Sequence, residues 1–537
     1  RRRDAYLLTE AATMHTSVSR PVAVRRRAAL LIGTLAAASL AGCVDLAVTD
    51  PNNLSIATVF NNAANTEAAL IGSFKAYTAV NRGSCPTLIY SLWGHDITTT
   101  SVTYLEFAVE PRLPINNRDN VNCATRVSYW TPYEASAGAR EAFIGIRDNK
   151  LKFGTINAAT PDGADTPNRK LFAKFIIAMS QLKLALATDQ AYITDSITPG
   201  LNQTNVTLVP WQDVLANAKA QMNVVIAEAK AGPNFTWPAL FINGRPITRD
   251  ELVRVMYSFL VRADVYSPRT PAARNAVNWN AVLARLDSGI TRDFGWQADP
   301  AVANTASTYI NNSFAQNTVR IHNRLLGPAD TSGKYQAWVA APIANRTAFT
   351  ITTPDRRIHG ATNSVAGTRF TVLTTTMGSA SNGAYLTSSY RSTRYLNTAA
   401  DSGNRAFIQI MSMDEMKFIR AEALFRVGRF TDAAALINPT RVAAGLRAVD
   451  ANGPPAGRDC VPRKDNGACG DLFDAIQYEK RIELYPTEGD ISWWDARGWG
   501  KLVPGTPYHV PVSGRELISL GIPYYTFGGV GSPGTAP

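Results

Sequence analysis

Runs of helical periodicity constrain the fold of this chain more than any other feature of its sequence. Several segments between Tyr129 and Ile290 repeat apolar residues every three or four positions, which places them on one face of an α-helix. The segment KLFAKFIIAMSQLKLALATDQ, residues 170–190, is strongly apolar and predicts a buried helix. Thr248 precedes Glu251 by three residues, the pattern of a helix-capping box. A mostly α-helical chain is therefore expected.

The helical character is interrupted twice. Interpreted from pattern alone, the helical scaffold covers roughly 54–80, 128–290 and 411–500, and a loop-rich lobe with short strands covers roughly 81–127 and 291–410. In the last scaffold segment, Ala421 and Ala423 precede Gly428, and Phe430 begins a second helix. This pair resembles one tetratricopeptide unit, and any such units are degenerate because no clean repeat is visible.

The first 42 residues have the layout of a bacterial lipoprotein signal peptide. A cationic segment, RPVAVRRR, precedes the apolar run Ala28–Gly42, which is shorter than the roughly 20 residues that cross a bilayer core. Leu40–Cys43 resembles a lipobox, in which the cysteine is lipidated and becomes the new amino terminus. We expect a start at Met14, lipidation of Cys43 and one domain over 43–537. Several acyl chains on one residue give stable attachment.

Net charge and cysteine content indicate which ligands and which cysteine chemistry to expect. Of the net charge of +12, the leader contributes seven arginines and two acidic residues, so +7 remains without a dense basic block. Binding to nucleic acid is therefore not expected. The four remaining cysteines indicate disulfides in an exported protein, and proximity favours Cys85–Cys123 and Cys460–Cys469. A zinc site is the weaker alternative because no C-x-x-C pair occurs.

Four features, in order, resemble the SusD/RagB family of outer-membrane nutrient-binding lipoproteins. They are the lipobox with CVDLAVTDPNN and NTEAALIGSFKAY, then VSYWTPYEASAGAREAFIGI, then SMDEMKFIRAEALFRVGRFTDAAALIN, and finally AIQYEKRIELYPTEGDISWWDARGWGKL. The chain departs from the family at Asp490 and Trp493, where arginine and an apolar residue are usual. Only Asp45 follows the cysteine where the family's export signal is acidic.

The resemblance implies a SusD-like helical scaffold with degenerate tetratricopeptide helix pairs and an irregular lobe that carries the ligand site. It implies an outer-membrane lipoprotein, facing outside, that binds an oligosaccharide or in some branches a peptide. Such a protein delivers its ligand uncut to a SusC-like TonB-dependent transporter. A surface-coat or adhesion lipoprotein is the alternative, and an exported hydrolase ranks below it.

Catalytic and cofactor motifs are absent from the sequence. Histidines after the leader occur singly, and H-E-x-x-H, G-x-S-x-G and Gly-rich phosphate loops do not occur. Glu479 and Glu483 lie one helical turn apart, with Glu488 and Asp490 nearby, and paired carboxylates serve glycoside hydrolases. The adjacent cations Lys480 and Arg481 favour a charge network on a helix surface instead. We expect no enzymatic activity, metal or cofactor.

Sugar binding requires aromatic faces for the C–H faces of pyranose rings and polar groups for the hydroxyls. Many of the 10 Trp and 19 Tyr residues belong to the core, and WWDARGW is interpreted as packing. Aromatic residues in irregular polar surroundings are the better candidates, with neighbouring polar residues to bind hydroxyls. The predicted ligand-binding residues are Trp93, Asp96, Tyr104, Arg112, Tyr335 and Trp338.

Overall fold

The computed structural model describes residues 59–82, 87–117, 123–194, 207–242, 244–299, 319–375, 377, 380–394, 406–487, 490–529, 531–532 and 534–536. The chain divides into two compact units, Arg1–Thr58 and Val59–Pro537, and every described residue belongs to the second. Cys43 and Cys85 lie outside the described residues, as does the side chain of Cys123. Within the described ranges, no helix is long and apolar enough to cross a membrane.

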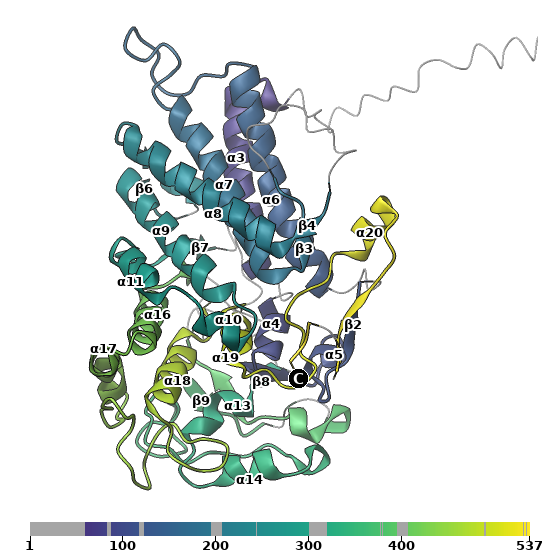
Figure 1. Ribbon diagram of the computed structural model, residues 1–537, viewed down its shortest axis with the longest axis vertical. Coiled ribbons are helices and arrows are strands. Elements are labelled where there is room, and N and C mark those ends of the chain that lie inside the picture. The colour runs from purple at the N-terminus through teal and green to yellow at the C-terminus, as the bar shows by residue number, and fades with distance from the viewer. Residues whose placement is uncertain are drawn as a thin grey trace, which may run out of the picture. The chain divides into compact units, whose positions relative to one another are not determined.

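Five long helices form the first part of the scaffold, and each packs against the next one along the chain (Figure 1). They are α3 (Ala63–Arg82), α6 (Cys123–Asp148), α7 (Thr166–Ala187), α8 (Trp211–Ala231) and α9 (Arg249–Tyr266). Nearly every residue of α7 is buried, which explains why its sequence is apolar on all sides. At the start of α9, the side chains of Thr248 and Glu251 each accept a hydrogen bond from the other's backbone N–H. The predicted capping box is confirmed.

Two buried arginines satisfy the C-terminal ends of α7 and α9. Arg269 donates a hydrogen bond of 2.8 Å to the carbonyl oxygen of Ala185, and Arg497 donates to those of Leu186 at 2.7 Å and Tyr266 at 2.9 Å. The last carbonyl groups of a helix lack partners within it and carry the negative end of its dipole. Arg497 lies on a later helix, so its bonds join the first part of the scaffold to the second.

A second helical group follows. It comprises α10 (Pro271–Asn275), α11 (Trp279–Asp287), α16 (Met413–Arg426), α17 (Phe430–Ala443), α18 (Leu472–Leu484) and α19 (Asp490–Trp499). Helices α16, α17 and α18 pack against one another. Gly428, at φ +80°, joins α16 to α17, and the fully buried Ala421 and Ala433 lie in the same apolar cluster. Small side chains let these two helices pack closely, so the predicted helix pair is confirmed.

Short elements make up the remainder of the described chain. The short helices are α4 (Thr87–Trp93), α5 (Leu105–Ala108), α13 (Asn323–Leu326), α14 (Lys334–Ala340), α20 (Gly514–Leu520), and the 3-10 turns η2 (Ala239–Ile242), η3 (Gly327–Ala329), η4 (Ile343–Asn345), η5 (Ala380–Asn382) and η6 (Ala384–Leu386). This combination of long helices and short elements confirms the mostly α-helical expectation.

The strands of the described ranges pair in antiparallel two-stranded sheets. The pairs are β1 (Ile97–Thr99) with β8 (Val319–Ile321), β2 (Pro114–Asn116) with β12 (Thr526–Gly528), β3 (Gln190–Ala191) with β4 (Val209–Pro210), β5 (Thr236–Trp237) with β6 (Ile247–Thr248), β7 (Phe294–Ala298) with β11 (Ala406–Met411), and β9 (Phe370–Val372) with β10 (Tyr390–Ser392). In the β1–β8 pair, Ile97 lies opposite Ile321. This register holds the turn after α4 beside α13, where a cavity forms.

Candidate binding site

A cavity of 350 Å³ lies between α18, α19 and the turns that pack against them. Helix α18 contributes Asp474, Gln477, Tyr478 and Arg481. Residues three and four positions apart share one face of a helix, so these four side chains all face the same side. The helix thus presents a polar face with one aromatic ring to the cavity.

Helix α19 forms a second wall through Ser492, Ala496 and Trp499, again at helical spacing, and Lys501 follows it. Trp499 is half-buried, and its indole N–H lies 3.2 Å from a carboxylate oxygen of Glu422, to which it donates. Burial and this hydrogen bond fix the indole in place. An indole that lines a cavity in a fixed position is suited to stack on a flat ligand.

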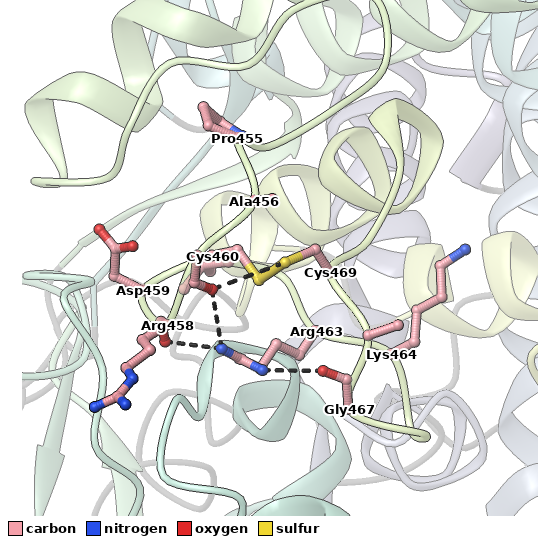
Figure 2. The surroundings of a disulfide bond; sticks show 12 residues. Pro455, Ala456, Arg458, Asp459, Cys460, Arg463, Lys464, Gly467 and Cys469 are labelled. Carbon is pink, nitrogen blue, oxygen red and sulfur yellow. Dashed lines mark hydrogen bonds between the residues drawn. A yellow bond between two sulfur atoms is a disulfide. The ribbon is translucent and has the colours of Figure 1, made fainter.

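The segment closed by the Cys460–Cys469 disulfide forms a third wall (Figure 2). Arg463 of this segment donates hydrogen bonds to the backbone carbonyl oxygens of Arg458 at 2.8 Å and Gly467 at 2.9 Å. These bonds and the disulfide hold the backbone that supplies Pro462–Asp465 to the cavity lining.

Gly94 and His95, in the turn after α4, form a fourth wall. A Cβ atom on Gly94 would lie 2.4 Å from the hydroxyl oxygen of Ser492 and 2.8 Å from its backbone carbon. Only glycine therefore permits the turn to approach α19 this closely. Arg481 of α18 donates to the carbonyl oxygens of Gly94 at 2.9 Å and His95 at 3.1 Å, which fastens the turn to α18.

His95 also belongs to a cluster with Glu110 and His322, whose ligand atoms lie within 4.8 Å of one another. Three such residues can hold a metal, but cations surround this cluster. Arg112 donates to His95 Nε2 at 2.9 Å, and the guanidinium of Arg324 lies 3.6 Å from the Glu110 carboxylate. Burial lowers the pKa of His95 to about 3, so His95 is neutral at physiological pH. The donor set fits a carboxylate that neutralises arginines better than a metal centre.

Three of the predicted ligand-binding residues lie outside the cavity lining, two of them buried and one half-buried. Trp93 exposes 1% of its surface and packs in an aromatic cluster. Arg112 is also buried and donates to the carbonyl oxygens of Phe107 at 2.5 Å and Leu92 at 3.2 Å. Tyr104 is half-buried and packs against the main apolar core. Direct contact of these residues with a ligand stays a prediction.

The other three predicted residues lie at or behind the cavity wall. Tyr335 lines the cavity, and its ring stacks on Trp338 with centroids 6.3 Å apart. Trp338 is 6% exposed and has the guanidinium of Arg346 over its ring. Asp96 pairs with Arg481 at 3.2 Å, and burial raises the pKa of its carboxyl to about 6. Of the six predicted residues, only Tyr335 is part of the lining itself.

The carboxylates Glu479 and Glu483 do form a charge network, but they do not lie on a helix surface as predicted. Their exposures are 0% and 6%. Arg357 pairs with both, at 2.6 Å and 2.9 Å. The adjacent cations pair with other carboxylates, Lys480 with Asp495 at 2.7 Å and Arg481 with Asp96 at 3.2 Å. Helical spacing reveals shared faces but not which face a distant segment covers. Glu488 lies outside the described residues.

Several residues that line the cavity were not predicted from the sequence, among them Gln477, Tyr478, Arg481 and Trp499. WWDARGW was interpreted as packing, which holds for Trp493 and Trp494, at 0% and 1% exposure. Trp499 instead lines the cavity. The polar face of α18 is visible in DAIQYEKR as a three- and four-residue spacing, and that signal alone could have pointed to the wall.

No protein-family model and no curated protein matches the amino-acid sequence. Solved structures do match. A SusD superfamily protein from Parabacteroides distasonis aligns with a TM-score of 0.53 at 11% identity, covering 86% of this chain and 99% of that one. One from Bacteroides thetaiotaomicron gives 0.50 at 15% identity, with coverage of 86% and 97%. One from Bacteroides fragilis gives 0.50 at 14% identity, with coverage of 82% and 91%. These matches establish a shared fold over most of the chain.

Proposed function

Because this chain has the SusD-like fold, we propose that it is a cell-surface protein that binds an oligosaccharide in the cavity described above and delivers it to a TonB-dependent transporter. The observation that carries the proposal is the half-buried ring of Trp499 among hydrogen-bonding side chains around one cavity, with the buried rings of Tyr478 and Tyr335 in its wall. Pyranose rings present C–H faces to aromatic rings, and their hydroxyls need donors and acceptors. A volume of 350 Å³ is typical of a small-molecule site.

Binding without cleavage fits the carboxylates of this region. Glycoside hydrolysis needs two carboxyl groups that flank the scissile bond. Glu479 and Glu483 are instead buried and paired with Arg357. Two carboxylates among the described residues do line the cavity: Asp474 pairs with Lys464 at 3.2 Å, and Asp465 lies beside the hydroxyl of Tyr335. We therefore assign this cavity a binding role.

Titration calorimetry of the full chain against a panel of oligosaccharides tests the binding proposal. Trp499→Ala should weaken binding tenfold or more, which corresponds to about 1.4 kcal/mol. Trp499→Phe should retain part of the affinity because a ring remains. The matched control is Tyr257→Ala, which removes a half-buried aromatic ring on α9, away from the cavity lining. Equal affinity of Trp499→Ala and the unaltered chain would contradict the proposed site.

Delivery to a transporter needs its own test. We propose that lipidated Cys43 anchors the protein in the outer membrane beside the transporter. The tagged chain, expressed with its signal peptide, would be purified from detergent-solubilised outer membranes, with Cys43→Ala as the control. Recovery of a TonB-dependent barrel at a near one-to-one ratio, lost in Cys43→Ala, is the expected result. Recovery of only further copies of the chain would favour a surface coat and contradict delivery.

A further inference from the structure

The charges around the cavity are unequal. Five cationic side chains line it, and they come from α13, the disulfide-closed segment, α18 and the turn after α19. They are Arg324, Arg463, Lys464, Arg481 and Lys501. Among the residues that the structure describes, two carboxylates, Asp465 and Asp474, line the same cavity. A neutral oligosaccharide does not require this excess of positive charge.

Three of these five cations lie close to a carboxylate, which partly neutralises their positive charge. Lys464 pairs with Asp471 at 3.0 Å. Arg481 pairs with Asp96 at 3.2 Å. The guanidinium of Arg324 reaches Glu110 only at 3.6 Å. These three cations therefore contribute orientation and hydrogen bonds more than net charge.

Arg463 differs from the others in the partners of its guanidinium. Its bonds go to the backbone carbonyl oxygens of Gly457 at 3.2 Å, Arg458 at 2.8 Å and Gly467 at 2.9 Å. Within the described chain, no carboxylate lies within 4.0 Å of it, and its buried Nε has no hydrogen-bond partner. Carbonyl groups satisfy N–H donors but leave the positive charge intact.

Lys501 adds a second charge that is only weakly balanced. Among the described residues its carboxylate partner is Asp474, at 3.9 Å, and its side chain is 58% exposed. A positive charge at the wall of a low-dielectric cavity attracts anions more strongly than the same charge on an open surface. Because both Nη atoms of Arg463 already donate to backbone carbonyl oxygens, Arg463 would attract an anion through its charge and not through a bidentate pair of hydrogen bonds.

We propose that the cavity takes an acidic oligosaccharide, whose carboxylate or sulfate group pairs with Arg463 and Lys501. This inference names the ligand class of the proposed oligosaccharide site and therefore rests on that proposed function. Aromatic rings would hold the sugar faces, and the two cations would select for charge.

The test uses titration calorimetry of the full chain with matched ligands. Tetragalacturonic acid carries carboxylates, its methyl ester is the same tetramer without charge, and a carrageenan tetrasaccharide carries sulfates. We expect at least one acidic tetramer to bind ten times more tightly than the methyl ester, and to lose affinity between 50 and 300 mM NaCl because salt screens charge. Which acidic tetramer binds identifies the anionic group.

Amino-acid substitutions test whether Arg463 and Lys501 are the residues that favour acidic ligands. Arg463→Gln and Lys501→Gln should each weaken acidic binding more than methyl-ester binding. For Arg463→Gln, which also loses bonds that hold the cavity wall, the ratio of the two affinities should fall about tenfold or more. Arg515→Gln, an exposed arginine on α20, is the matched control. Lys501 is largely exposed, so its variant keeps the test valid if Arg463→Gln does not fold.

Two results would contradict the proposed selection of acidic ligands. One of them would also contradict the proposed oligosaccharide site. If neutral oligosaccharides bind in a Trp499-dependent manner as tightly as acidic ones, the charge selection is wrong and the oligosaccharide site stands. If no oligosaccharide of either kind binds, both proposals are wrong.

Discussion

Replacing Arg357 with methionine should destabilise the wall of the cavity more than any surface change. Arg357 is 3% exposed and joins the segment before β9 to α18. Its guanidinium donates to Asp355 at 2.7 Å, to Glu479 at 2.6 Å and to Glu483 at 2.9 Å. Methionine fills a similar volume without a charge, so the three carboxylates lose their shared cation.

The expected loss of unfolding free energy depends on which cationic partners each carboxylate keeps in Arg357→Met. Glu479 keeps Arg441 at 2.8 Å, and Glu483 keeps Arg369 at 2.9 Å. Within the described part of the chain, Asp355 keeps neutral donors, such as the hydroxyl of Tyr478 at 2.6 Å. Breaking one buried ion pair costs about 3–5 kcal/mol. Because two of the three carboxylates remain paired, we expect the lower end, about 3 kcal/mol.

Thermal unfolding measures this loss. With an unfolding entropy of about 2.1 cal/mol/K per residue, 3 kcal/mol lowers the midpoint of a 537-residue chain by about 3 °C. Arg357→Met/Asp355→Asn removes the stranded carboxylate and should recover most of the loss. Arg429→Met, at an exposed surface pair, is the control and should shift the midpoint by less than about 0.5 °C. Equal shifts for both arginines, or no recovery in the double variant, would refute the reasoning.

Three further outcomes are expected. Cys460→Ser/Cys469→Ser should cost about 2–3 kcal/mol and weaken oligosaccharide binding, because the disulfide closes a short segment that lines the cavity; thermal unfolding and calorimetry measure both. Burial raises the pKa of Asp96 to about 6, above its unfolded value of about 3.9, so this carboxyl stabilises the fold fully below about pH 4 and loses that contribution as pH rises through 6. Between pH 4 and 6.5, the thermal unfolding midpoint of the unaltered chain should therefore fall relative to that of Asp96→Asn. Midpoints that change in parallel with pH would contradict a raised pKa for the buried Asp96. Thr248→Ala should cost about 1 kcal/mol in thermal unfolding by removing the cap of α9, whereas Thr248→Ser should cost little.

Much of the scaffold was predictable because helical signals are local. The apolar segment at 170–190 became the buried α7, and Thr248 with Glu251 caps α9. Gly428 ends α16 at a positive φ that favours glycine. Each of these depends on residues within one or two helical turns, so the sequence carries all the information needed.

The cavity was not predictable in the same way, because its walls come from segments that are distant in the chain. Arg357 meets Glu479 across 122 positions, and Arg481 meets the carbonyl of Gly94 across 387. Trp93 and Trp499 look alike in sequence, yet one is buried in an aromatic cluster and the other lines the cavity. Local periodicity determined the helices of this protein. Long-range packing alone decided which side chains are covered, which charges are paired and which remain available to a ligand.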